Sequence, residues 1–414
     1  MLRKPYIGVL LSIFEYFTHP QYRYWGDHLP DIRYPMIISS VLCISFVLNY
    51  RQVFLESRGK NESGVGYLMF YWVNMIFVWL LYSVNSDATM NAVIDYAQLI
   101  IFYFLIVNLF NDKVKIDYVL MLLIFGYLYF SYEAWGKSLR EGRLEGIGGA
   151  GSRDANHLAN DMLAVIPFIG TYFLYGNNYQ KLLVLFAAPF ILNLMILCNS
   201  RGAYLGLAGA GVVYILMCSV KNLKKVLPIA SVGVILFFSL TDQRFDERFF
   251  SITEYKEDSS SSQRLQSWEG AIRMLKDHPL GTGESGFSYL SPIYIPEIVE
   301  SYDGNRRNVH NTPLSVLTSW GYIGGILFFL FHLYTYRLLF KTRNFCKQTN
   351  DEKGEYLAVA MISGLFGFLV AAMFGIRQDA PVLLWMTGLS AAMYNVFKKD
   401  YMLSSDDKES QNET

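Results

Sequence analysis

The sequence predicts an all-α membrane protein whose chain crosses the bilayer about twelve times. Apolar residues make up 53% of its 414 residues and charged residues only 17%, against roughly 25% charged in an ordinary soluble domain. Apolar runs of about 20 residues, the length that a helix needs to cross a bilayer, recur along most of the chain. The 35 Lys and Arg residues balance the 35 Asp and Glu residues, so no positive excess points to nucleic acid as a partner.

Apolar periodicity predicts the following helices in chain order. They cover roughly 5–18, 34–50, 67–84, 92–110, 116–132, 158–175, 181–198, 203–219, 225–240, 313–340, 356–374 and 381–397. The first is short for a bilayer crossing, so it is either a tilted span or a re-entrant element. If it spans, both termini lie on one side. The loops on that side hold most of the Lys residues and the opposite loops mostly Arg. The larger basic total on the side of the termini assigns that side to the cytoplasm.

These stretches divide the chain into four parts. We expect a transmembrane bundle of about nine spans over 1–240, an extracytoplasmic loop over 241–312, C-terminal transmembrane helices over 313–399 and a disordered cytoplasmic tail over 400–414. Within the loop, Leu265, Trp268, Ile272 and Leu275 recur at helical spacing, which predicts a helix over 262–276. The tail is polar and offers little to bury.

Arg201 lies in a turn of a few residues between two predicted spans, at the outer face. Its guanidinium group has two explanations: it reaches the lipid headgroups, or it lies near the bundle axis and holds a bound anion or an acidic side chain. Asp154 and Asp161 are the candidate acidic partners. Gly202 and Gly206 follow at the spacing of a small-residue face, which predicts close helix packing.

A polar cluster from Arg153 to Asp161 opens the helix expected after it. Ordinary helix capping explains Asp154 and Asn156. It leaves Asn160 and Asp161 unexplained, since both lie a turn inside an apolar helix. The spacing of four residues places Asn156 and Asn160 on one helix face.

His310 and Asn311 end the long loop directly before a predicted span. An imidazole with a pKa near 6.5 accepts protons at neutral pH, although a lone histidine at a membrane interface is by default a surface residue. The histidines and cysteines form no cluster, so we predict neither a metal nor a cofactor. The segment from Gly281 to Gly286 matches GxGxxG but follows a helix rather than a strand. It therefore predicts a tight re-entry of the loop and not a dinucleotide site.

Four segments taken in order carry a family resemblance: RDANHLAN, NSRG, SSSQRLQSWEGAIRMLKDHPLGTGESGF and VHNTPLSVLTSWGYIGG. Together they resemble the O-antigen ligase and polymerase superfamily of bacterial envelope glycan transferases. The opening RKPYIGVLLSIFEYFTHPQYRYWGDHLP is similar to the branch described as exosortase-associated O-glycosylation ligases.

The resemblance implies a multi-span, metal-independent enzyme of the bacterial inner membrane, with its large loop and active site on the periplasmic face. Such enzymes move a glycan from undecaprenyl pyrophosphate to a glycan, lipid or protein acceptor. The resemblance implies that Arg201 and Arg264 bind the pyrophosphate, that His310 is the general base on the acceptor hydroxyl and that Asn311 orients it. Arg153 and Asn156 match the polar cluster before the sixth span, and we add Asn160 to the predicted substrate-binding set.

Two alternatives stay open. A ligase and a repeat-unit polymerase of the same superfamily share this site chemistry, and the N-terminal resemblance favours the ligase. A transporter or flippase is a different class that also suits twelve spans. Transporters place ionisable groups near the bilayer midplane, whereas the charges here gather at one face, which favours an interfacial enzyme.

Overall fold

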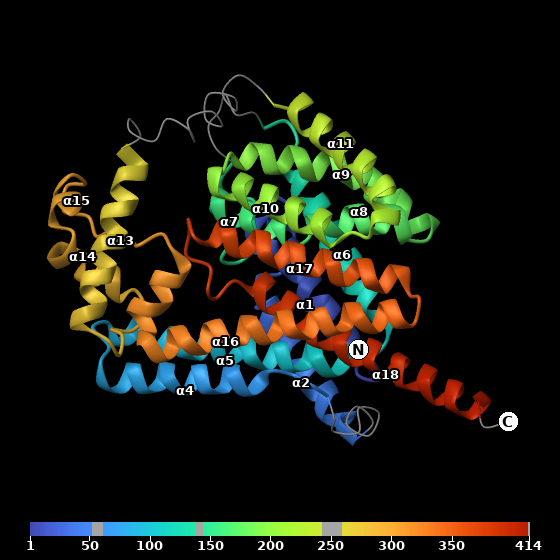
Figure 1. The fold of residues 1–414 in the computed structure, drawn as a ribbon. Helices are drawn as coiled ribbons and strands as arrows, with labels where there is room; N and C mark the ends of the chain where they lie inside the picture. Colours follow the sequence, from blue (N-terminus) through green and yellow to red (C-terminus); the bar gives the residue numbers. More distant parts are fainter. Residues whose placement is uncertain (52–60, 138–143, 242–258, 413–414) are drawn as a thin grey trace.

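All regular elements of the protein are helices in the residues that its computed structural model describes, which are 1–51, 61–137, 144–241 and 259–412 (Figure 1). The elements in order are α1 (Tyr6–Thr18), the short 3-10 helices η1 (Pro20–Tyr22) and η2 (Gly26–His28), α2 (Tyr34–Leu48), α4 (Val65–Leu81), α5 (Ser86–Leu109), α6 (Lys113–Glu133), α7 (Ala155–Leu163), α8 (Ile166–Tyr175), α9 (Asn178–Cys198), α10 (Arg201–Met217), α11 (Val220–Ser239), α13 (Ser259–Asp277), α14 (Gly286–Tyr294), α15 (Pro296–Glu300), α16 (Thr312–Gln348), α17 (Glu352–Ala372) and α18 (Pro381–Asn412).

The helices make this a multi-span membrane protein, as the sequence predicts. Seven segments in the described ranges are long and apolar enough to cross a bilayer, one of them being α7 and α8 taken together, and α2, α4 and α10 are shorter apolar helices. The predicted total of about twelve crossings is not confirmed, because α1 has 13 residues and those three helices have 15 to 17, short of the usual span length.

One predicted helix is two helices. The apolar stretch 158–175 contains Pro167, which lies in the first turn of α8, while α7 ends at Leu163. A proline in the first turn costs little, but its ring and its missing N–H prevent one continuous hydrogen-bonded ladder through this point. The break leaves α7 as a separate short helix at one end of the bundle.

The polar tail also differs from expectation. Residues 400–412, predicted to be disordered, continue α18 to Asn412. Asp400 pairs with Lys113 at 2.8 Å, and the ring of Tyr401 stacks on Phe345 with 5.0 Å between centroids. These contacts with neighbouring helices hold the first turn of the tail in the helical conformation, which a composition argument does not foresee.

Helices α10 and α17 pack with their backbones almost in contact. A Cβ atom added to Gly206 would lie 2.5 Å from the carbonyl oxygen of Gly367, and one added to Gly367 would lie 2.7 Å from that of Gly206. Gly202, one turn earlier, packs against the side chain of Phe374. The predicted small-residue face at Gly202 and Gly206 is therefore confirmed, and it brings the start of α10 close to the end of α17.

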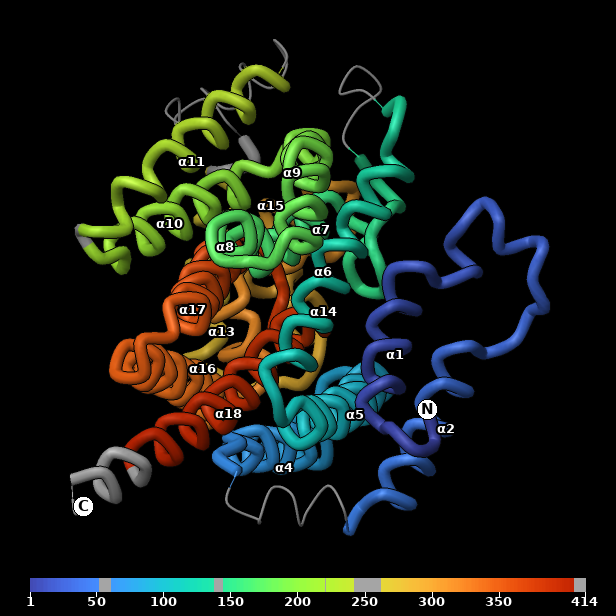
Figure 2. Tube along the Cα trace, turned by 90° about the vertical axis from the view of Figure 1, so that its right-hand side faces the viewer, coloured from blue at the N-terminus to red at the C-terminus, as the bar shows by residue number. Residues whose placement is uncertain are grey.

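The bundle has one ionic end, where both chain termini lie. Lys113 pairs there with Asp351 at 2.7 Å and with Asp400, and Asn49 donates to the carbonyl of Leu2 at 2.6 Å. Figure 2 views the helices from this end, with α1 and α2 at one edge and α11 at another. The chain thus begins and ends on the same side of the bundle.

Helices α13, α14 and α15 cover the opposite end, and α13 lies across the ends of the longer helices (Figure 1). The helix predicted over 262–276 is confirmed within α13. The segment has a small core of its own, made by Ala271, Met274, Phe287, Tyr294, Ile295, Ile298, Val299 and Val309. Residues 242–258 of the predicted loop lie outside the described residues.

The glycine motif at 281–286 joins this segment to the bundle. Helix α16 breaks at Gly321, where the backbone has a φ of +69°, and the peptide N–H of Gly283 donates to the carbonyl of Ser319 in that break at 2.9 Å. A Cβ atom on Gly281, whose φ is +92°, would lie 2.5 Å from the same carbonyl oxygen. Only glycine allows this approach, so the predicted tight re-entry is confirmed.

Candidate functional site

The turn between α9 and α10 brings two site residues together. Asn199 ends α9 in the left-handed conformation with a φ of +46°, which Asn tolerates better than most residues. Ser200 and Arg201 follow directly and begin α10. Because the turn has no spare residues, both side chains stay at the end of the bundle that α13 covers.

Helix α7 presents a polar face to the same place. The carboxylate of Asp154 caps it by accepting from the peptide N–H groups of Asn156 at 2.8 Å and His157 at 3.3 Å. Asn156, His157 and Asn160 then line a common pocket. Asn160 is only 3% exposed, and neither amide atom has a hydrogen-bond partner among the described residues. Buried polar atoms without partners are uncommon in proteins and often mark functional sites.

The start of α16 is tied to the loop after α17. Asn311 caps α16 by accepting from Leu314 N at 3.0 Å, and its Nδ2 donates to the carbonyl of Met373 at 3.1 Å. The hydroxyl of Thr312 accepts from the peptide N–H of Arg377 at 2.9 Å. These two hydrogen bonds therefore fix the position of the loop that carries Arg377 relative to the start of α16.

Helix α13 completes the arrangement. The indole Nε1 of Trp268 donates to the carbonyl of Val309 at 3.2 Å, and its ring lies 6.4 Å from that of Phe374. Trp268 therefore faces the bundle and not the solvent. Arg264 lies one turn before Trp268, on the same face of the helix, and lines the pocket.

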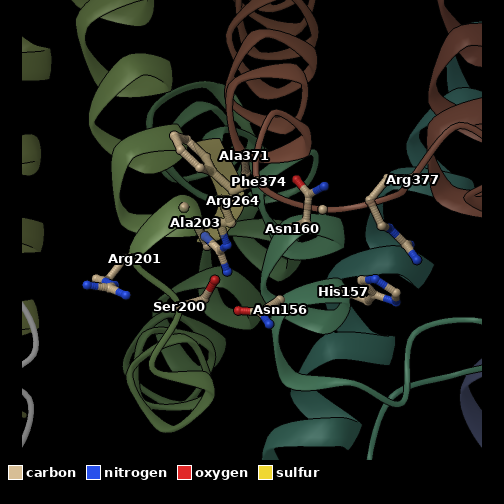
Figure 3. A pocket seen from close by; sticks show the side chains of 12 residues that line it. Asn156, His157, Asn160, Ser200, Arg201, Ala203, Arg264, Ala371, Phe374 and Arg377 are labelled. Atoms are coloured by element: carbon tan, nitrogen blue, oxygen red, sulfur yellow. The ribbon is translucent and has the colours of Figure 1, made fainter. Parts of the chain in front are cut away.

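These elements enclose a pocket of about 130 Å³ (Figure 3). Of the seven predicted site residues, four line it, and they are Asn156, Asn160, Arg201 and Arg264. In the view of Figure 3, Arg264 lies near Ser200 and Asn156, whereas the guanidinium group of Arg201 points away from the other labelled side chains. The remaining lining residues are His157, Ser200, Gly202, Ala203, Ala371, Phe374, Gly375 and Arg377.

A buried ion pair lies beside the pocket. Arg377 is 3% exposed and pairs with Asp161, which has no exposure, and it also donates to the carbonyl of Gly151 at 2.7 Å and to the hydroxyl of Ser152 at 3.0 Å. Asp161, one of the two acidic side chains that the sequence offered as candidate partners of Arg201, pairs with Arg377 instead. The buried Asp in an apolar helix was the only signal of this pair, because nothing in the sequence points to its partner 216 positions away.

His310 has a left-handed backbone with a φ of +46°, and it lies within electrostatic reach of Arg264 and His157, which line the pocket. Desolvation lowers the pKa of His310, the positive charges of Arg264 and Arg307 lower it further, and the carboxylate of Asp154 acts in the opposite direction. The imidazole is therefore mainly neutral at pH 7 and able to accept a proton.

Two predicted residues lie apart from the pocket lining. Arg153 stacks over the ring of Tyr22, with 4.6 Å to the centroid, and its Nε donates to the carbonyl of Gly146 at 3.3 Å. Asn311 uses both ends of its amide in the cap and the tie to Met373, so its side chain acts on the backbone around the site.

No group of three or more His, Cys, Asp or Glu side chains that would hold a metal ion occurs within the four described ranges.

Comparison with known proteins identifies the central part of the chain. Residues 185–329 match the family model described as O-antigen ligase. This match covers about a third of the chain, and it supports the O-antigen ligase and polymerase superfamily that the sequence resembles. No curated protein matches the chain. The matched segment contains Arg201, Arg264, His310 and Asn311. Helix α7 and the loop of Arg377 lie outside it, so parts of the chain on both sides of the match complete the pocket.

Proposed function

We propose that this protein transfers a glycan from undecaprenyl pyrophosphate to an acceptor hydroxyl at the extracytoplasmic face of the bacterial inner membrane. The observation that carries the proposal is the pocket at one end of the bundle, which gathers Arg201, Arg264, Asn156 and Asn160 from three helices. His310 lies within electrostatic reach of Arg264 beside it. The match to the O-antigen ligase family supports the same reaction class.

Arginine is suited to the donor side of this reaction. When the bond between the sugar and the diphosphate breaks, negative charge grows on the departing phosphate oxygens. A guanidinium group pairs with phosphate through two parallel N–H donors. Arg264 lies inside the pocket and Arg201 at its edge, and each is expected to contribute about 3–4 kcal/mol of transition-state stabilisation.

His310 is suited to the acceptor side. The attacking hydroxyl must lose its proton as the new bond forms, and a neutral imidazole accepts it. The lowered pKa of His310 keeps the ring neutral at pH 7. Asn311 supports the base indirectly, because its cap and its bond to Met373 fix the start of α16 directly after His310.

The location of the site also favours an enzyme over a transporter. The pocket lies at one end of the helices, next to α13, and not midway along the spans, where transporters bind their substrates. We assign the ionic end with both termini to the cytoplasm, because Lys residues concentrate there. The pocket end is then extracytoplasmic, where lipid-linked glycans are joined to acceptors.

Replacement of His310 tests the base. We expect His310→Ala to lower the transfer rate by about 10²–10⁴-fold, because the hydroxyl loses its proton acceptor. The matched control is His278→Ala, which removes a histidine of the same outer segment that does not line the pocket. Transfer is measured with the full-length proteins in a deletion strain, at equal amounts in the membrane. Product from His310→Ala at the level of the control would remove His310 from the reaction.

Replacement of Arg264 tests the donor side. Arg264→Ala is expected to weaken binding of farnesyl diphosphate, a short polyprenyl diphosphate, by at least tenfold. Lys276→Ala is the control, since it removes one positive charge from the same helix at an exposed position. Equal affinities in the two variants would contradict the proposed role of Arg264.

The deletion strain also separates the two branches of the family. Accumulation of lipid-linked full-length glycan indicates a ligase, and accumulation of single lipid-linked repeat units indicates a polymerase. Unchanged glycans together with a lost solute flux would support a carrier instead.

A further inference from the structure

A second cavity, of about 430 Å³, opens between α1, η1 and the start of α2. We call it the α1–α2 cavity. Its lining includes Tyr16, His19, Gln21, Arg33 and Ala150. Its volume falls in the range of roughly 300–1,000 Å³ that is typical of small-molecule sites. The reaction described above uses none of these side chains directly.

The polar groups of the cavity form an ordered chain. Glu15 pairs with His19, the Nε2 of His19 lies 3.2 Å from the Oε1 of Gln21, and the Nε2 of Gln21 donates to Asp31 at 3.1 Å. The ring of His19 also lies 4.6 Å from that of Tyr22. The lining therefore combines aromatic rings with groups that both donate and accept hydrogen bonds.

This chemistry selects a neutral polyhydroxyl ligand. A hydroxyl needs a donor and an acceptor at once, and carboxylate, imidazole and amide groups supply both. A phosphate would need an excess of cations, but among the described residues that line the cavity one arginine, Arg33, is matched in number by one carboxylate, Glu15. A saccharide meets these requirements, because it has hydroxyl groups at its edge and C–H faces that pack on aromatic rings.

The cavity is linked to the candidate site by two hydrogen bonds. The hydroxyl of Tyr16 donates to the hydroxyl oxygen of Ser152 at 3.1 Å, and Arg377 donates to the same oxygen at 3.0 Å. Tyr16 lines the α1–α2 cavity and Arg377 lines the first pocket, so one serine hydroxyl connects the two walls.

A short path also leads from the cavity toward His310. Ala150 lines the cavity, and Asp154, four residues later, acts electrostatically on His310. Four residues reach at most about 14 Å. Asp154 caps α7, whose Asn156 and His157 line the first pocket, so a saccharide of a few units that is anchored in the cavity can extend over this loop toward that pocket.

The family match separates the two sites. Residues 185–329 contain Arg201, Arg264 and His310, but none of the residues of the α1–α2 cavity. A transferase needs a donor site and an acceptor site, and the residues assigned to the donor lie inside the matched segment. We propose that the α1–α2 cavity binds a saccharide of the acceptor, an inference that rests on the proposed glycan transfer.

A filled cavity tests the proposal. Met36 lines the cavity and is 57% exposed, so Met36→Trp adds bulk there without disturbing a packed core. Val47→Trp is the matched control, because Val47 lies on the same helix, is 70% exposed and does not line the cavity. Gln21→Ala is a second variant, which removes one amide from the polar chain and leaves the cavity open.

The full-length proteins are assayed in lipid nanodiscs with a series of concentrations of acceptor extracted from envelopes of the deletion strain. We expect Met36→Trp to lower transfer at least tenfold at limiting acceptor and to approach the control rate as acceptor is raised. Gln21→Ala should raise the KM for the acceptor severalfold with an unchanged kcat. The Kd for farnesyl diphosphate should stay within twofold of the control in both variants.

Three results would overturn the proposal. The first is equal transfer by Met36→Trp and Val47→Trp at every acceptor concentration. The second is loss of farnesyl diphosphate binding in Met36→Trp, which would make the cavity part of the donor site. The third is that phospholipid stays bound to Val47→Trp but is released by Met36→Trp, while the transfer rates of the two variants are the same. That result would assign the cavity to a lipid headgroup. Failure of the proposed glycan transfer would be seen in a separate measurement: Arg264→Ala would then bind farnesyl diphosphate as tightly as its control.

Discussion

At the scale of single residues, the site depends on how buried and half-buried charges are balanced. Asp161 neutralises Arg377 in a region with almost no solvent access, and Arg264 lines the pocket beside this pair. Around His310 the nearby charges are mainly positive, because Arg264 and Arg307 both disfavour protonation of the imidazole. Arg377 is thus compensated by a buried carboxylate, whereas Arg264 and Arg307 lower the pKa of His310.

The charge near His310 predicts a shift in pH dependence. In the wild type, kcat/KM should fall on the acid side at a pH below 6.5, the ordinary pKa of imidazole, because the pKa of His310 is lowered. Arg307→Gln removes a positive charge, so the pKa of His310 rises and activity is lost at a higher pH. Arg306→Gln is the control, since Arg306 stacks on Tyr289 and is not among the main charges that shift the pKa of His310. The pH profile of kcat/KM checks this, and identical profiles for both variants would contradict it.

The buried ion pair predicts a large loss of stability when it is broken from one side. Asp161→Asn leaves the guanidinium of Arg377 buried without its counter-charge, which should cost about 3–5 kcal/mol. Asp161→Leu combined with Arg377→Met removes both charges and should recover much of that loss. Lys113→Met breaks a pair whose Lys side chain is 45% exposed, and it should cost at most about 1 kcal/mol. Unfolding of the purified full-length proteins in detergent measures these differences, and equal losses in the two single variants would contradict the assignment.

At the scale of elements, short connections set the positions of the site residues. The cap of Asn311 and the hydroxyl of Thr312 fix the start of α16 to the loop that carries Arg377. Trp268 holds α13 against Val309 in the same way. The glycine re-entry at Gly281 ties the segment from α13 to α15 to the break of α16.

The glycine re-entry predicts a sharp contrast between two substitutions. Gly281→Ala places a Cβ 2.5 Å from a backbone oxygen at a φ of +92°, so the loop must move out of the break in α16 and the folded yield should drop strongly. Gly304→Ala has a similar φ of +79° but no heavy atom within 4 Å of the added Cβ. It should cost only about 1–2 kcal/mol for the left-handed backbone. The fraction that stays monodisperse after detergent extraction compares the two, and similar values would argue against the packing described.

At the scale of the whole molecule, the two ends of the bundle have different chemistry. One end holds the termini and ion pairs such as Lys113 with Asp351. The other end holds the pocket, the α1–α2 cavity and the folded segment from α13 to α15. The proposed donor, anchored in the bilayer by its polyprenyl chain, and the proposed saccharide acceptor would meet at this end.

This polarity predicts opposite accessibility for two exposed positions. Asn305→Cys lies in the outer segment and Lys399→Cys at the ionic end, and both are tested in a Cys43→Ser background, because Cys43 is the exposed natural thiol among the described cysteines. A membrane-impermeant maleimide should label Asn305→Cys in cells with a permeabilised outer membrane. It should label Lys399→Cys only after the inner membrane is opened. Labelling of both positions from outside would contradict the assigned orientation.

Local sequence was sufficient for much of this protein. The apolar runs, the small-residue face at Gly206, the helix around Trp268 and the glycine re-entry all depend on neighbours within a few turns, and they were predicted correctly. Pro167 and the helical start of the tail were misread. The proline break lies inside an otherwise uniform apolar run, and the tail is held by Lys113 and Phe345 from distant helices.

The tertiary structure decided which of the candidate residues meet. The sequence and its family resemblance predicted a substrate-binding set of five residues: Arg153, Asn156, Asn160, Arg201 and Arg264. The structure brings the last four of them to one pocket, adds Arg377 to its lining and places Arg153 over the ring of Tyr22. The reason is physical: helix propensity and hydropathy are local properties. The pairing of a buried charge with its counter-charge depends on which helices pack together, and for Asp161 and Arg377 that contact joins residues 216 positions apart.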